Sequence, residues 1–369
     1  MTVLPRRPVL RWLLPALVAL VLAAGGSAAG VITAAARSDL PHRSAAQLLV
    51  DVQKARLDGL SGTIVQNADL GLPALPDVGG SGSSSLTSLV SGSHTLRLWY
   101  AGPNRVRLAL LGSLGESDVV RNGTDLWTWS SKDKSAGHHV VPLSKDAPES
   151  LASASPMTPQ RAAEAALHAI DPSTEVRSGG TTNVAGRSAY QLVLRPRDRD
   201  SLVRSIRIAI DGATHVPTRV QVFARNQGKP AFEVGFTSFD PTRPAASVFR
   251  FNPPPGTKVT EGSDSPLPGH LGPAVGTRSS GPRSSGPAQS PTVVGSGWTT
   301  VLVTRVPNGA LKGSGSMGQL LGALPKVSGS WGSGRVLQGT LFSAVLTDDG
   351  RIAVGAVSPQ RLYTALSHG

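Results

Sequence analysis

The feature that most constrains this chain is a series of short segments in which apolar and polar residues alternate. The segments HTLRLWY and RVRLAL follow one another and are separated by a turn containing Gly102, Pro103 and Asn104. Because successive side chains of a strand point to opposite faces, this alternation predicts strands with one buried face. The residues between the two segments are typical of a tight turn, so the segments are predicted to form an antiparallel hairpin.

Similar segments continue through the first 260 residues. A strand is predicted in SGTIVQNADL, and a second hairpin in SDVVRNGTDLWTWSS, which turns at Asn122 and Gly123. Four more strands are predicted in AYQLVLRP, SIRIAID, TRVQVFAR and FEVGFTSF. FRFNPPPG is interpreted as the closing strand, because Phe249 and Phe251 alternate and the following prolines lack the N–H groups that continue a sheet. We therefore expect about nine or ten antiparallel strands.

Only two helices accompany this sheet in the prediction. Ser44 and Gln47 have the spacing of a capping box, and apolar residues then recur at helical intervals until Gly59. A second helix is predicted after Thr158, with Pro159 at its first position. The predicted fold class is α+β, with a curved antiparallel sheet that has one arginine-bearing face and one apolar face covered by helices.

Two helices are few for so wide a sheet, and this mismatch indicates the candidate functional site. A curved sheet can leave an apolar cavity beneath its helices, and such cavities bind hydrophobic ligands. In the alternative interpretation, side chains fill the space completely. The candidate cavity-lining residues are Leu96, Leu98, Val106, Leu108, Leu110, Trp127, Trp129, Leu192, Leu194, Ile206, Ile208, Val220, Val222 and Phe236. For the two tryptophans, which share a strand face, the alternative is packing in the core.

The N-terminal residues 1–36 indicate export. Three arginines precede an uncharged run from Trp12 to Ala36, which is typical of a secretory signal or an N-terminal membrane anchor. Either outcome predicts an extracytoplasmic protein whose attachment to the membrane depends on this segment. The chain has no Cys, so it has neither disulfides nor the lipidated cysteine of a bacterial lipoprotein.

The formal charge of +13 does not indicate nucleic-acid binding, because the arginines are scattered through the predicted strands. A basic surface near an anionic membrane is the preferred interpretation. Asp198 and Asp200 lie among three arginines, and this cluster is interpreted as a solvated turn, with a partner-docking patch as the alternative.

The chain is predicted to contain two domains, residues 37–260 and 298–369. Between them, residues 261–297 repeat Ser-Ser-Gly-Pro and form a predicted linker. The smaller C-terminal α+β domain is predicted to contain a strand from Trp298, a short helix in MGQLLGAL and a hairpin turning at Asp349 and Gly350. A final helix is predicted from Pro359 to Ser367.

Patterns for catalysis or metal binding were not found in the sequence. HExxH and GxSxG are absent, and the glycine-rich GSGSMG lacks the strand and acidic residue of a dinucleotide site. His138 and His139 fall in a predicted polar loop, with no nearby carboxylate to complete a metal site. We therefore expect no enzyme activity, no cofactor and no metal.

The order of these features resembles one known superfamily. An export segment, a capped helix, a meander of strands containing DLWTWSSK and the terminal FRFNPPPGTKV resemble the LolA-like lipoprotein carriers, with their RseB/MucB and mycobacterial-type lipid-binding relatives. The Arg, Ala and Gly-rich composition resembles actinobacterial members. The resemblance implies an unclosed β half-barrel that binds a lipid or lipoprotein acyl chain. Its RseB/MucB branch implies an alternative, an envelope-stress regulator that contacts an anti-sigma factor through the C-terminal domain.

Overall fold

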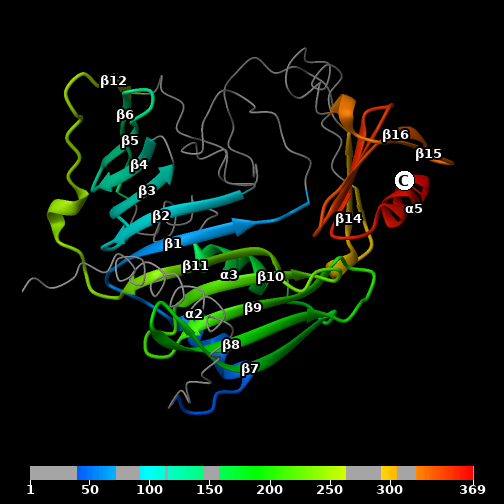
Figure 1. Ribbon diagram of the computed structural model, residues 1–369, viewed down its shortest axis with the longest axis horizontal. Helices are drawn as coiled ribbons and strands as arrows, with labels where there is room; N and C mark the ends of the chain where they lie inside the picture. The colour runs from blue at the N-terminus through cyan, green and yellow to red at the C-terminus, as the bar shows by residue number, and fades with distance from the viewer. Residues whose placement is uncertain are drawn as a thin grey trace, which may run out of the picture. The chain divides into compact units, whose positions relative to one another are not determined.

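The computed structural model describes residues 40–71, 92–112, 115–143, 158–168, 170–262, 292–305 and 321–368. These residues form a twelve-stranded sheet and a six-stranded sheet (Figure 1). The predicted export segment, residues 72–91 and most of the predicted linker lie outside this set. Within it, none of the helices has the length and apolar character needed to cross a membrane.

The twelve-stranded sheet consists of two meanders that meet at its centre. Its strands are β1 (Leu60–Ala68), β2 (Gly92–Tyr100), β3 (Arg105–Gly112), β4 (Gly115–Asn122), β5 (Asp125–Ser130), β6 (Ser135–Val140), β7 (Thr174–Val184), β8 (Arg187–Pro196), β9 (Val203–Asp211), β10 (Pro217–Ala224), β11 (Pro230–Asp240) and β12 (Lys258–Glu261). Their spatial order is β12-β6-β5-β4-β3-β2-β1-β11-β10-β9-β8-β7. The two meanders therefore join where β1 pairs antiparallel with β11.

The predicted fold class is confirmed, since the larger sheet is curved and open and a smaller α+β part follows it. The sheet is wider than predicted, because β6, β7 and β12 were not expected as strands. The polar loop predicted around His138 and His139 is wrong, because both residues lie in strand β6. These missed strands lie at or next to the sheet edges, where few apolar residues are needed.

The closing strand predicted in FRFNPPPG is also wrong. Phe249 ends a short 3₁₀ helix, η2 (Ala246–Phe249), and Phe251 lies outside any strand. The sheet resumes after the prolines, where β12 pairs with β6 in parallel. The chain thus crosses the sheet from β11 at its centre to β12 at its edge, as Figure 1 shows. The alternating phenylalanines cover the sheet and are not part of its hydrogen-bonded ladder.

Both helices of the larger part begin where the sequence predicts them. In α2 (Ala45–Lys54), Gln47 N–H donates to Ser44 Oγ and Ser44 N–H donates to Gln47 Oε1, which completes the capping box. In α3 (Pro159–His168), Arg161 N–H donates to Thr158 Oγ1 at 3.3 Å. Helix α2 packs on β7 and β8, and α3 packs mainly on β10 and β11.

The six-stranded sheet has its own apolar core. Its strands are β13 (Thr292–Val294), β14 (Val301–Arg305), β15 (Lys326–Gly329), β16 (Gly332–Gln338), β17 (Ser343–Thr347) and β18 (Arg351–Gly355). Helix α5 (Pro359–His368) packs on β14, β17 and β18, which confirms the predicted final helix. The predicted hairpin through Asp349 and Gly350 is confirmed as β17–β18. The predicted strand from Trp298 begins later, because residues Gly297–Thr299 form a 3₁₀ helix. The first half of the predicted MGQLLGAL helix lies outside the described residues, and residues 321–323 in its second half are helical.

Several contacts join the segments that carry the two sheets. The Trp298 indole N–H donates to Thr174 Oγ1 at 2.7 Å, and Leu202 N–H donates to the carbonyl of Ala356. In the cluster interpreted as a solvated turn, Asp200 pairs with Arg361 of α5 at 2.5 Å while both side chains stay about half exposed. This acidic turn is therefore both solvated and bound to the C-terminal segment.

Candidate functional site

Twelve of the fourteen candidate residues lie on one face of the large sheet. The register runs across the strands from Leu192 to Ile208 and Val220, and from Ile64 to Leu96 and Leu110. Because β1 and β11 pair Ile64 with Phe236, the apolar rows of the two meanders meet on the same face. We name this the inner face, and the opposite one the outer face. The predicted separation into an apolar and a polar face is therefore present across seven strands, β8 to β11 and β1 to β3.

The inner face is almost completely removed from solvent. Eleven of its twelve candidates are buried and Val222 is partly buried. Leu48 of α2 and Ala163 and Ala166 of α3 belong to the same apolar cluster. The apolar area that these two α3 residues bury is small, because alanine side chains are small. The inner face is thus packed against helices that include small side chains at the contact.

The principal helix contacts cover only part of this face. They involve β7, β8, β10 and β11, whereas Leu98 and Leu108 lie on β2 and β3 in the other meander. A polar cross-strand pair, Gln66 and His94, also lies buried on the inner face near β1 and β2. Neither residue was a sequence candidate, although both occupy the apolar side of an alternating strand. The inner face is therefore apolar with one polar position.

The two candidate tryptophans lie elsewhere. Trp127 pairs with Val120 and Trp129 pairs with Asp118, and this register places both rings on the outer face. They do share a face with each other, as predicted. Phe251 packs on both, with ring centroids 5.4 Å and 6.3 Å away. The strand alternation shows which side chains share a face, but the register between distant strands decides which face that is.

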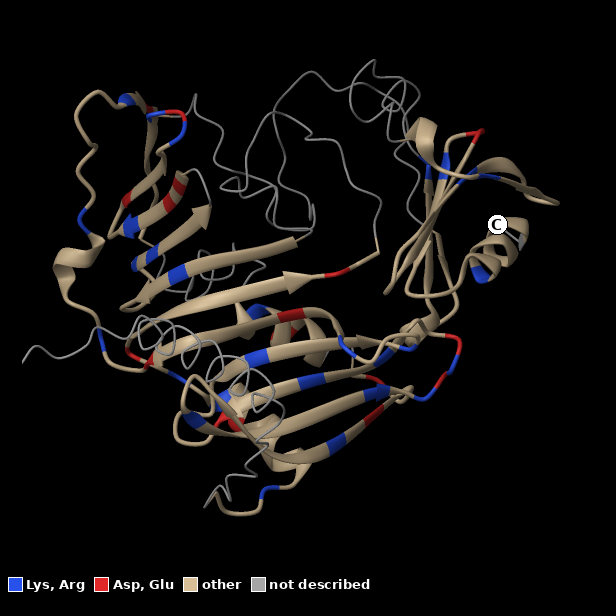
Figure 2. Cartoon of the chain, viewed as in Figure 1, with Lys and Arg blue, Asp and Glu red and all other residues tan. Residues whose placement is uncertain are grey.

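The outer face carries the arginines of the prediction. Figure 2 shows Lys and Arg spread along the strands of the larger sheet and not gathered in one block. Arg107 donates to Asp118 at 2.6 Å, and its guanidinium also lies 5.5 Å from the Trp99 ring centroid. Burial raises the pKa of Asp118 to about 6, although the Arg107 charge acts in the opposite direction. The outer face thus contains a partly buried ion pair beneath the η2 crossing, where Arg107 also reaches the Val248 carbonyl.

His138 on the outer face has two carboxylate partners that sequence proximity did not indicate. Its Nδ1 lies 2.7 Å from Glu261 Oε2 of β12, and its Nε2 lies 3.0 Å from Asp125 Oδ1 of β5. The ring stacks on Trp127 at 4.2 Å between centroids. Burial alone lowers the pKa of His138, but the two carboxylates outweigh it and raise the pKa above its usual value. Among the described residues no group of His, Asp and Glu side chains forms a possible metal site.

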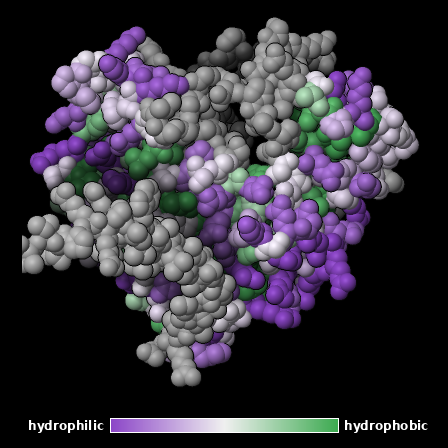
Figure 3. Space-filling model, viewed as in Figure 1, coloured by the Kyte–Doolittle hydropathy of each residue, from purple (hydrophilic) through white to green (hydrophobic). Residues whose placement is uncertain are grey.

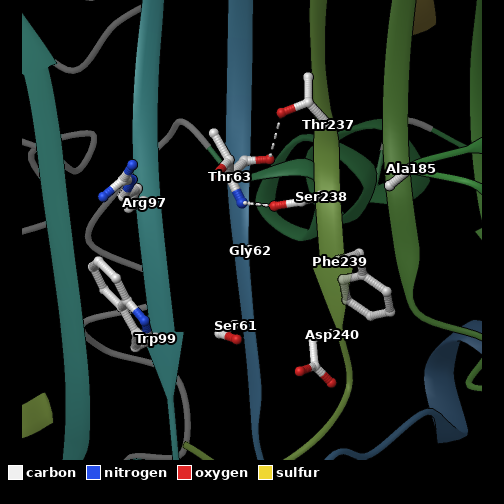
Figure 4. Close-up of a pocket in the computed structure, with 10 residues that line it drawn as sticks. All are labelled: Ser61, Gly62, Thr63, Arg97, Trp99, Ala185, Thr237, Ser238, Phe239 and Asp240. Atoms are coloured by element: carbon white, nitrogen blue, oxygen red, sulfur yellow. Dashed lines mark hydrogen bonds between the residues drawn. The ribbon is translucent and has the colours of Figure 1, made fainter.

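A pocket of about 470 Å³ lies on the outer face, between β2, β1 and β11 (Figure 4). None of the fourteen candidate residues lines it. Its walls are mostly hydroxyl, charged and aromatic side chains, in contrast to the inner face. The pocket is therefore a second feature of the sheet, separate from the predicted acyl-chain site.

No protein-family model and no curated protein matches this sequence. Solved structures do match. The MucA/MucB complex of Pseudomonas aeruginosa matches with 16% identity and a TM-score of 0.38, over 87% of this chain and 96% of that one. A LolA superfamily protein from Nitrosomonas europaea matches with 10% identity and a TM-score of 0.21, over 57% and 99%. The Mycobacterium tuberculosis lipoprotein LppX matches with 11% identity and a TM-score of 0.27, over 51% and 92%.

All three matches have identities of 16% or less and TM-scores of 0.38 or less, so they establish nothing about the ligand of this chain. The ligand must be argued from the residues of this chain.

Proposed function

We propose that this chain is a non-catalytic extracytoplasmic binding protein that holds a lipid or lipoprotein acyl chain against the inner face. The observation that supports the proposal is the continuous apolar face across seven strands, of which only β8, β10 and β11 have principal helix contacts. An acyl chain placed between sheet and helices gains about 0.8 kcal/mol for each buried CH₂ group. We propose that the twelve inner-face candidates line this site.

The helix side of the site is suited to exchange with a ligand. Ala163 and Ala166 present small side chains to the sheet, so moving α3 away costs less apolar contact than moving a leucine-lined helix. The ligand would replace these contacts with its own methylenes. Export and attachment to the membrane through residues 12–36 remain part of this proposal.

Native mass spectrometry of the full chain, purified without detergent, tests the proposal. We expect lipid that co-purifies with the protein or is taken up when fatty acid is added. Leu98→Phe, which enlarges a buried inner-face side chain, should reduce uptake. Thr95→Phe is the matched control, because Thr95 lies on the same strand but on the outer face. An apo mass with no uptake, or equal loss in both variants, would contradict the proposed site.

A second candidate function is an envelope-stress regulator whose C-terminal part binds an anti-sigma factor. The supporting observation is the face of the six-stranded sheet away from α5, where a cross-strand row is apolar: Val293, Leu302, Val354, Ala344 and Leu337. Val293 is 61% exposed and Leu302 is 37% exposed. Hydrophobic side chains also gather over this sheet in Figure 3. Such an exposed row is typical of a protein-binding surface.

Affinity purification of the full chain from solubilised membranes separates the two functions. A regulator should retain an anti-sigma protein, identified by mass spectrometry, and Leu302→Glu should lose it. Arg305→Glu is the control, since Arg305 is an exposed residue at the end of the same strand. Lipid binding without such a partner would leave the carrier function as the better account.

A further inference from the structure

The outer-face pocket has a simple origin in the strand register. Two cross-strand rows pass through it, Trp99–Ser61–Asp240 and Arg97–Thr63–Ser238. In each row β1 contributes a small hydroxyl residue between larger groups on one or both neighbouring strands. Because neighbouring strands lie about 4.8 Å apart, each row spans roughly 10 Å. The pocket is the space left above the small side chains of β1, and Figure 4 shows these residues around it.

One wall of the pocket carries a free cation and a fixed aromatic ring. Arg97 is exposed, and its side chain makes no hydrogen bond or ion pair with any other described residue. Its guanidinium therefore keeps five N–H donors for a ligand. Trp99 is half-buried, and the Arg107 guanidinium, held by Asp118, lies 5.5 Å from its ring centroid. The ring is thus supported by a group that is itself fixed.

The opposite wall supplies acceptors. Thr242 N–H donates to Asp240 Oδ1 at 2.9 Å, and the hydrogen bonds from Thr242 hold the pKa of Asp240 below its usual value. Asp240 is therefore an ionised carboxylate at neutral pH, and a carboxylate accepts up to about four hydrogen bonds. Thr63 N–H donates to Ser238 Oγ at 3.0 Å, which leaves the Ser238 hydroxyl proton available to a ligand.

A cation, a carboxylate, hydroxyl groups and an aromatic ring together favour some classes of ligand over others. An acyl chain would leave the Arg97 guanidinium without a partner and would offer the Asp240 carboxylate no hydrogen bond beyond that from Thr242, which is unfavourable for charged groups. A phosphate would pair with Arg97 but would face the Asp240 carboxylate, which repels it. A saccharide hydroxyl both donates and accepts, so one sugar can satisfy Arg97, Asp240 and the serine hydroxyls together. Its apolar C–H face can pack on the Trp99 ring.

We infer that the pocket between Trp99, Arg97 and Asp240 is a binding site for a neutral saccharide. Its volume falls within the range of roughly 300–1,000 Å³ that is usual for small-ligand sites. The site lies on the opposite face from the proposed acyl-chain site, so one chain could hold an apolar group and a glycan at once. The inference does not depend on lipid binding.

Saturation-transfer NMR and calorimetry with the full chain test the inference, using glucose, N-acetylglucosamine, maltose and inorganic phosphate as probes at millimolar concentrations. At least one sugar should bind, and phosphate should not compete with it. Trp99→Ala, Asp240→Asn and Arg97→Gln should each weaken that sugar by about tenfold or more, since each removes a partner of the ligand. Arg195→Gln is the matched control, because Arg195 is exposed on β8, away from the pocket.

Circular dichroism of each variant verifies that it is folded, and the surface substitutions Asp240→Asn and Arg97→Gln remain informative if Trp99→Ala unfolds. The inference is overturned if none of the three sugars binds, if phosphate displaces the bound sugar, or if the Arg195 control weakens sugar as much as the pocket variants do.

Discussion

The two sheets of this protein distribute apolar residues in different ways. In the twelve-stranded sheet the inner face is apolar and buried, while the outer face carries arginines, an ion pair and a polar pocket. In the six-stranded sheet both faces are apolar. Val303 and Val345 are buried on the face that α5 covers, while Leu302 and Val354 lie on the opposite face. The comparison indicates that a sheet with one polar face can leave that face in contact with solvent. A sheet with two apolar faces keeps one apolar face available to bind another protein.

The helices that cover the two sheets also differ in the apolar side chains that they contribute. Helix α5 packs on the small sheet through Leu362, Ala365 and Leu366, all of which are buried. Helix α3 packs on the large sheet through two buried alanines, Ala163 and Ala166, while its Leu167 is only partly buried. The small sheet therefore has a firmly packed helix on one face, and the large sheet has a helix that is easier to displace. This is the contrast on which the proposed acyl-chain site depends.

The largest expected effect comes from truncating one apolar residue in each sheet. Leu192→Ala should lower the free energy of unfolding by about 2–5 kcal/mol, because Leu192 is fully buried on the inner face. Leu302→Ala should lower it by about 1 kcal/mol or less, since part of that side chain is exposed. Guanidinium denaturation followed by tryptophan fluorescence measures both. Equal losses of stability would show that the apolar row containing Leu302 is covered in the native state.

The next effect concerns two carboxylates, one in each part of the molecule, whose pKa values are shifted in opposite directions. The pKa of Asp118 is raised to about 6, chiefly by burial, so the folded state binds its proton more tightly than the unfolded state. Relative to Asp118→Asn, the wild type should therefore become more stable as pH falls from 7.5 to 5, by about 1–1.5 kcal/mol. The pKa of Asp349 is lowered by its hydrogen bond from Thr347, so its contribution is lost only in acid. Thermal melting against pH checks both, and a flat difference for Asp118 would contradict the assignment.

The helix cap gives a smaller effect that sharpens the contrast between the helices. Ser44→Ala removes the acceptor for Gln47 N–H and should cost about 1 kcal/mol. Ser44→Asp retains an acceptor and should restore most of that loss. If neither substitution alters the melting temperature, then α2 contributes little to the stability of the large sheet.

The smallest effect concerns a sheet edge. The raised pKa of His138 means that its pairing with Glu261 and Asp125 stabilises β12 fully below pH 6.5 and is lost as pH rises through the raised pKa. Because both carboxylates are largely exposed, the gain should stay below about 1 kcal/mol. Hydrogen exchange of the β12 amides should quicken, relative to those of β15 at the edge of the small sheet, as pH rises. His138→Gln should abolish that pH dependence, and an unchanged profile would contradict the pairing.

Local signals in the sequence predicted a large part of the fold. The cap residues Ser44 and Thr158 act within a few residues of themselves, and both helices begin where these residues indicate. The hairpin turns at Asn122 and Asp349 are likewise local features, and both were predicted. The apolar alternation in β2, β3 and β8 to β11 identified side chains that are indeed neighbours on one face.

Residues that depend on distant partners were predicted less well. Phe249 and Phe251 alternate like a strand, yet η2 and the chain after it cross the outer face, where Phe251 meets Trp127 and Trp129. His138 has a partner, Glu261, that is 123 positions away in the chain. The outer-face pocket was also missed, because its cross-strand rows combine residues from β1, β2 and β11. Its sequence signal was the small hydroxyl residues Ser61 and Thr63 at alternate positions of one strand.

The sequence by itself determined which residues form hairpins, which side chains share a strand face and where helices begin, because these depend on contacts within a few residues. Only the tertiary structure decided that β1 pairs with β11, that the tryptophans lie opposite the leucines, and that Arg97 and Asp240 line the same pocket. Register between strands far apart in the chain is fixed by the burial of whole faces at once. A strand shifted by one residue would keep its own alternation and still place every side chain on the wrong side.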